Sequence, residues 1–169
     1  VFMHLYYNAF QPGSMMDVRS RTIQDPDSRV MDRISKLEEN ETGFHKIISV
    51  IDKKGTKLSF KEDGTILQIS LDKPLNPGKV LQLDLLFKSQ IPVQIRRTGR
   101  YNKEDVAYSM TQWYPKVCEY DIDGWHTNPY IGREFYGVWG DFDVTINIDK
   151  SFVLGGTGIV QNPQEVGPV

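Results

Sequence analysis

The sequence predicts an all-β fold, mainly antiparallel, with one short helix. Two observations carry this prediction. Apolar residues alternate with polar ones over several runs, which is the pattern of strands with one buried and one solvated face. Turn-forming Gly, Asn, Asp and Pro residues separate the runs. With 169 residues, the chain has the size of a single domain and buries enough surface to hold a core without disulfides or metal.

The predicted strands follow one another along the chain. Four of them predict an antiparallel meander, near 44–52, 56–61, 65–72 and 79–89. A further pair is predicted at 141–149 and 152–161. In the first of these, Val144 and Ile146 lie on the same side, so both are expected to face the core, whereas Thr145 is expected to face water.

The single helix is predicted near 29–39. Val30, Ile34 and Leu37 recur at helical spacing. A helix of about ten residues is marginal in isolation, so it is expected to pack on a sheet. Residues 11–28 have no period and predict a loop.

Residues 101–140 carry an unusual density of aromatic side chains with few aliphatic ones. The rings are Tyr101, Tyr108, Trp113, Tyr114, Tyr120, Trp125, Tyr130, Phe135, Tyr136 and Trp139. Two interpretations are open. The rings wedge a long ordered loop against the sheet, or they form a recognition surface, because aromatic side chains serve both roles.

Composition and motifs exclude several classes of function. A net charge of −2 does not indicate the basic surface that nucleic-acid binding requires. No apolar run approaches the ~20 residues of a membrane span. The lone Cys118 excludes a disulfide framework. His4, His45 and His126 are isolated, and none begins the H-E-x-x-H zinc motif. We therefore predict no catalytic residue, no metal ligand and no cofactor within this chain.

Several motifs occur in a recognisable order in the second half of the chain. They are Gln112-Trp113-Tyr114-Pro115 within 108–116, Gly-Trp-His at 124–126, Pro-Tyr-Ile-Gly-Arg-Glu-Phe-Tyr at 129–136 and Gly-Asp-Phe-Asp-Val-Thr-Ile at 140–146. This order resembles the N-terminal domain of the aminopeptidase N-type (gluzincin) zinc metallopeptidases. The resemblance is strong over about 108–163, and the opening 4–10 is also similar to a strand and turn of that domain.

The resemblance implies a saddle-like β-sandwich over 1–169 that packs on a thermolysin-like catalytic domain. In that family the zinc ligands, the catalytic glutamate and the G-x-M-E-N motif belong to the catalytic domain, so zinc is expected there and this chain alone is expected to be inactive. The implied partners are the catalytic domain of the same polypeptide and the N-terminus of a peptide substrate. The chain is expected to be truncated at both ends, and the sequence does not fix the compartment, although a periplasmic or secreted location is favoured.

The resemblance also implies a substrate-binding set. Family members place a glutamine of this domain in the pocket for the first side chain of the substrate, and Gln112 is the candidate. Trp113 and Tyr114, which follow it in the sequence, complete the substrate-binding set. Alternatively, these two residues have a structural role. An alignment anchored on the Trp-Tyr-Pro turn instead places the counterpart of the glutamine near 104–106, where the chain has none.

Two further expectations remain open at this stage. The alternative to a peptidase domain is an independent β-sandwich module that recognises carbohydrate or peptide through its aromatic loop. An H-E-x-x-H motif about 100 to 200 residues downstream in the parent gene would distinguish the two. If strands that normally precede Val1 are missing, an exposed sheet edge or the aromatic face is expected to promote self-association.

Overall fold

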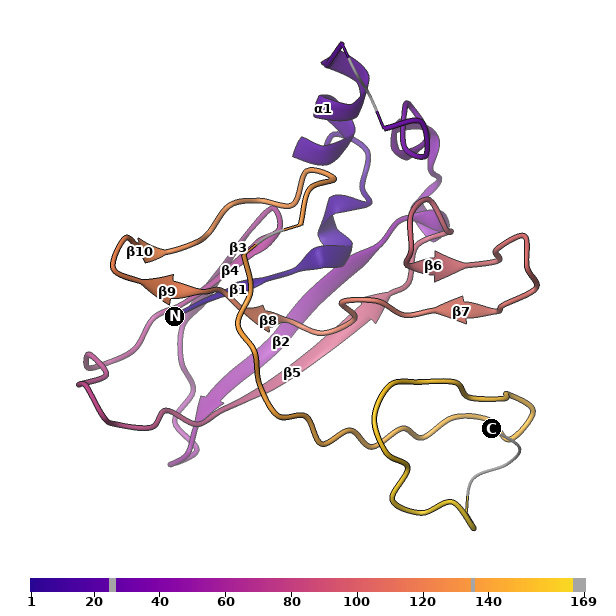
Figure 1. The fold of residues 1–169 in the computed structure, drawn as a ribbon. Coiled ribbons are helices and arrows are strands. Elements are labelled where there is room, and N and C mark those ends of the chain that lie inside the picture. The colour runs from indigo at the N-terminus through magenta and orange to yellow at the C-terminus, as the bar shows by residue number, and fades with distance from the viewer. Residues whose placement is uncertain (25–26, 135, 166–169) are drawn as a thin grey trace. The chain divides into compact units, whose positions relative to one another are not determined.

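The computed structural model describes residues 1–24, 27–134 and 136–165 (Figure 1). The described chain is mostly β, its strands pair antiparallel, and it contains one α-helix, which confirms the predicted fold class. The chain divides into two compact units, Val1–Val138 and Trp139–Val169. All the described helices and strands lie in the first unit.

A four-stranded sheet contains the first strand of the chain. In order across the sheet the strands are β3 (Phe60–Asp63), β4 (Ile66–Ile69), β1 (Phe2–His4) and β8 (Lys116–Val117). Met3 of β1 pairs with Leu67 on one side and with Val117 on the other. The sheet is therefore assembled from segments that lie far apart in the sequence.

The two longest strands form a second sheet, in which β2 (Phe44–Asp52) pairs with β5 (Leu83–Gln90). The register shifts between Ile47 and Ser49, where the ladder is irregular. This pairing corrects the predicted meander, because β5 returns to β2 instead of extending the sheet beyond β4. Two short hairpins complete the described strands: β6 (Gly99–Arg100) with β7 (Tyr108–Ser109), and β9 (Tyr120–Asp121) with β10 (Gly124–Trp125).

Two hydrophobic clusters hold the first unit together. One cluster takes Met3 and Leu67 from the four-stranded sheet and Ile47 and Val50 from the two-stranded sheet. Side chains from both sheets thus share one core, as in a β-sandwich. The other cluster, which we call the aromatic core cluster, combines the rings of Tyr6, Tyr7, Phe10 and Tyr130 with aliphatic side chains such as Ile34.

The helix lies elsewhere than predicted. Helix α1 spans Met15–Thr22, within the segment that was expected to be a loop. The hydroxyl of its N-cap, Ser14, accepts a hydrogen bond of 3.1 Å from the backbone N–H of Asp17. The Asp17 carboxylate is fully buried and pairs with Arg21 one turn later. Capping and this ion pair stabilise a helix whose apolar pattern is weak.

Residues 29–39 form turns and short 3-10 segments instead of the predicted α-helix. The 3-10 segments are η1 (Tyr6–Ala9), η2 (Ile34–Lys36) and η3 (Glu39–Glu41), the last two of them in or near this region. Val30 and Ile34 are buried, as their spacing predicts. Met31 has a φ of 43°, in the left-handed region, and this backbone conformation interrupts a regular α-helix.

The second unit contradicts the predicted strand pair. The structure shows no strand in residues 139–165. Val144 and Ile146, expected to face the core, are 50% and 60% exposed. Alternation buries one face only where a second layer covers it, and no pairing is present among the described residues of this unit. Separately, none of the helices in the described ranges is long and apolar enough to cross a membrane.

Candidate functional site

The predicted substrate-binding residues lie in the connection between β7 and β8, which we call the Gln112 loop (residues 110–115). Thr98, which is fully buried, anchors the start of this loop. Its hydroxyl donates a hydrogen bond of 3.0 Å to the carbonyl of Ser109 and accepts one of 3.2 Å from the N–H of Thr111. The loop is therefore fixed from a different segment of the chain.

Gly99 makes this anchor possible. Its φ is +148°, and a Cβ built on it would lie 2.3 Å from Cα of Gln94. No side chain fits that space, so the close approach of the two backbone segments requires glycine. The approach places Thr98 where it can reach the Gln112 loop.

Gln112 has an uncommon backbone conformation. Its φ of 56° is left-handed, which costs roughly 1–2 kcal/mol for a residue with a Cβ. The side chain is half-buried, and its amide makes no hydrogen bond to any residue that the structure describes. Strained residues persist where their surroundings hold them, often at ligand sites. The amide is thus available to a ligand.

The backbone carbonyl of Gln112 faces His45 of β2. The imidazole stacks on the ring of Tyr7 at 4.5 Å, and its Nδ1 lies 2.6 Å from Oγ of Ser89. Burial lowers the pKa of His45 to about 4, and the Gln112 carbonyl opposes this shift by favouring the charged ring. That carbonyl does not reach hydrogen-bond geometry, since Nε2 of His45 has no partner. His45 is therefore a neutral, structural support beneath the loop.

Trp113 and Tyr114 support the loop. Their rings meet edge to face at 5.4 Å, and both side chains are half-buried. Trp113 packs against the aromatic core cluster. Burial raises the pKa of the Tyr114 hydroxyl. The structure thus places all three predicted residues together, with the amide of Gln112 available to a ligand and Trp113 used in packing.

The aromatic segment is divided between core and surface. Tyr130 is buried and meets Tyr6 edge to face at 4.6 Å, whereas Trp125 is half-buried and contacts Phe2. Tyr101 and Tyr120 are largely exposed. Phe135 lies outside the described residues. Some rings of the segment therefore pack into the protein, as the first interpretation expects, and others are exposed, as a recognition surface requires.

Cys118, His126 and Asp121 are further titratable side chains in the region that follows the Gln112 loop. Burial raises the pKa of the Cys118 thiol to about 12, so it stays protonated and unreactive at neutral pH. His126 and Asp121 pair at 2.8 Å, the Asp121 carboxylate also accepts the backbone N–H of Asp123, and the imidazole meets the ring of Tyr136 edge to face. Within the described ranges, no three His, Cys, Asp or Glu residues come close enough together to hold a metal ion.

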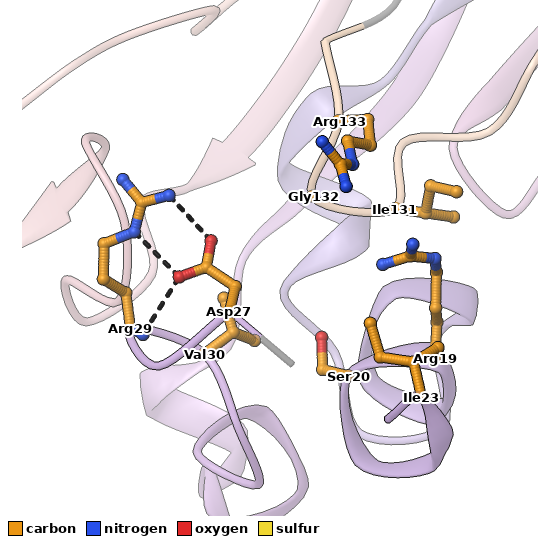
Figure 2. A pocket seen from close by; sticks show the side chains of 9 residues that line it. All are labelled: Arg19, Ser20, Ile23, Asp27, Arg29, Val30, Ile131, Gly132 and Arg133. Atoms are coloured by element: carbon orange, nitrogen blue, oxygen red, sulfur yellow. Dashed lines mark hydrogen bonds and ion pairs between the residues drawn. The ribbon is translucent and has the colours of Figure 1, made fainter. Parts of the chain in front are cut away.

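Sequence reasoning missed a pocket whose lining includes Val30, a member of the aromatic core cluster. The arginine pocket, shown in Figure 2, is lined by Arg19 and Ser20 of α1, by Asp27 and Arg29, and by Gly132 and Arg133, among others. One sequence feature could have indicated this pocket: all eight arginines lie within 19–33, within 96–100 or at 133. Only the fold shows that these segments meet.

In comparisons with protein-family models, with curated proteins and with solved structures, the chain gave no match.

Proposed function

We propose that this chain is the non-catalytic N-terminal domain of an aminopeptidase N-type zinc metallopeptidase. In this proposal the domain packs on the catalytic domain, which holds the zinc, and helps to shape the pocket for the peptide N-terminus. The motif order over 108–146 supports the family. The geometry of Gln112 is the single structural observation that carries the role.

The chemistry of Gln112 suits this role. A glutamine amide offers two N–H donors and a carbonyl acceptor, so it can accept from an α-ammonium group or bond a peptide group. It carries no charge that would bias the choice of the first side chain. The loop fixes the backbone of Gln112, so little conformational freedom remains to be lost there on binding.

The test begins with the reading frame of the parent gene, which is expected to encode H-E-x-x-H downstream. In the full-length enzyme, Gln112→Gly is the informative substitution, because glycine adopts the left-handed backbone without strain while removing the amide. A hydrogen bond to a charged group contributes about 1.5–3 kcal/mol, so kcat/KM for aminoacyl substrates should fall roughly 10- to 150-fold.

The control is Gln82→Ala, which removes an exposed amide outside the loop. It should leave kcat/KM unchanged. The thermal midpoint of the Gln112→Gly variant should equal or exceed that of the parent. Unchanged kcat/KM in a folded Gln112→Gly enzyme would overturn the role of Gln112, and a parent without the zinc motif would overturn the family.

A second candidate is an independent module that binds carbohydrate or peptide. The exposed rings of Tyr101 and Tyr120 favour it, because exposed aromatic rings stack on ligands. Saturable binding of a glycan or peptide that is lost in Tyr120→Ala, in a parent without H-E-x-x-H, would support this candidate over the first.

A further inference from the structure

The arginine pocket has the size and lining of a site for one small polar group. Its volume is about 230 Å³, below the ~300–1,000 Å³ typical of pockets for drug-sized ligands. Its walls come from α1, from the turn after it and from residues 131–133. All of these lie in the first unit.

The single acidic side chain that lines the described part of the pocket is already neutralised. Arg29 donates two side-chain hydrogen bonds of 2.8 Å to the Asp27 carboxylate, and Arg96 pairs with the same group. The hydrogen bonds from Arg29 contribute most to lowering the pKa of Asp27 to about 2. The Asp27 carboxylate therefore stays ionised at neutral pH and paired with Arg29 and Arg96, and it forms no ion pair with the other arginines of the pocket.

Two guanidinium groups are left over. Arg19 and Arg133 make no side-chain hydrogen bond or ion pair with any described residue, whereas Glu134, next to Arg133, pairs with Arg97 at 2.6 Å. In Figure 2, Asp27 and Arg29 are joined by dashed lines, and Arg19 and Arg133 have none. The described lining holds three arginines, Arg19, Arg29 and Arg133, and one carboxylate, that of Asp27, which Arg96 also pairs with, so this lining carries a net positive charge.

Ser20 gives an independent indication of a ligand. Its side chain lines the pocket and is 6% exposed, and its hydroxyl makes no hydrogen bond to any residue that the structure describes. Nε of Arg96, whose side chain is 9% exposed and lies outside the pocket lining, is buried without a partner. Buried polar side chains are normally satisfied, so the hydroxyl of Ser20 indicates a hydrogen-bond partner that is not part of the described chain.

We propose that the arginine pocket binds a phosphate-type oxyanion, with Arg19, Arg133 and the hydroxyl of Ser20 as its donors. The planar guanidinium fork matches the geometry of phosphate oxygens, and a hydroxyl completes the set. The small volume suits a phosphate group, either as free phosphate or as part of a small phosphorylated ligand. This site is separate from the Gln112 loop and does not depend on its proposed function.

The test is a titration of the whole chain with inorganic phosphate at constant ionic strength, balanced with chloride. Backbone amide shifts should saturate at residues 19–23 and 131–133. Arg19→Gln and Arg133→Gln should each weaken binding about tenfold or more, as expected for the loss of a charged hydrogen bond. Lys46→Gln removes one exposed positive charge from β2, outside the pocket, and should not change the affinity.

The same variants show whether the arginines are structural. Without phosphate, both should unfold at the same temperature as the parent or at a higher one, because each removes like-charge repulsion and no internal partner. A lower midpoint would assign them a structural role and overturn the proposal. Shifts that rise without saturation in every variant would reveal charge screening only. Equal affinity for acetate would overturn the assignment to phosphate, and tighter binding of a phosphomonoester than of phosphate would identify the source as a larger ligand.

Discussion

Acid should unfold this domain through two buried histidines before its carboxylates titrate. His4 and His45 are each 1% exposed, and burial lowers the pKa of each to about 4. Lys116 further lowers the pKa of His4. In the unfolded chain the pKa of histidine is about 6.5. The unfolded state therefore binds these protons first, and stability is lost as the pH falls from about 6.5 towards 4.

The magnitude follows from the two pKa values of each histidine. Between pH 7.5 and pH 5, each should lower the free energy of unfolding by about 2 kcal/mol, and the pair by about 4 kcal/mol. Carboxylates with a lowered pKa, such as Asp27, act in the same direction but only at lower pH, because their stabilisation is complete above about 4 and is lost towards 2. The two effects are separated in pH.

Urea unfolding of the chain at several pH values between 7.5 and 5 measures this effect. Replacing His45 by Phe together with Ser89→Ala removes the titrating ring and the hydroxyl it faces, so about half of the pH dependence should disappear. Tyr7→Phe is the control, because it should lower the stability equally at every pH in this range. A free energy of unfolding that is constant from pH 7.5 to 5 would refute the reasoning, as would a double variant with the full pH dependence.

Three further predictions concern packing and association. Gly99→Ala should destabilise the domain by about 3 kcal/mol or more in denaturant titrations, whereas Gly55→Ala, also left-handed but in open space, should cost only about 1–2 kcal/mol. Leu67→Ala should cost about 2–5 kcal/mol, and Ile146→Ala, now known to be exposed, should cost under about 0.5 kcal/mol; equal costs would contradict the described burial. Strand β5 pairs only with β2 among the described strands, so light scattering over a concentration series should show self-association that Leu86→Lys reduces, and a chain that stays monomeric throughout would count against an open edge.

The sequence predicted strands correctly where a second layer covers the apolar face, as in β2, whereas the equally long alternation at 141–149 forms no strand. The alternation over 44–52 has the same bounds as β2, because one face of that strand is buried and the other is solvated. It could not predict that β5 pairs with β2, since alternation defines a strand and not its neighbour. Helix α1 was not predicted, because its N-cap and the Asp17–Arg21 ion pair stabilise it more than any apolar stripe does.

The sequence named Gln112, Trp113 and Tyr114 as candidate binding residues, but it did not predict their geometry. Gln112 was named through the resemblance, but glutamine has no preference for a left-handed backbone. That conformation belongs to a loop held by Thr98, so it cannot be read from local sequence. The arginine pocket was missed for a related reason, because Arg19 and Arg133 line one pocket only after the chain has folded.

The central position of β1 has a consequence for how this protein is made. Met3 leaves the ribosome well before its two pairing partners, Leu67 and Val117. Until those partners emerge, both edges of β1 are open, and the four-stranded sheet cannot close before Val117 has been synthesised. Contacts so distant in sequence slow folding and prolong the exposure of aggregation-prone surface. A chaperone that binds apolar segments would therefore protect this protein mainly while it is a nascent chain.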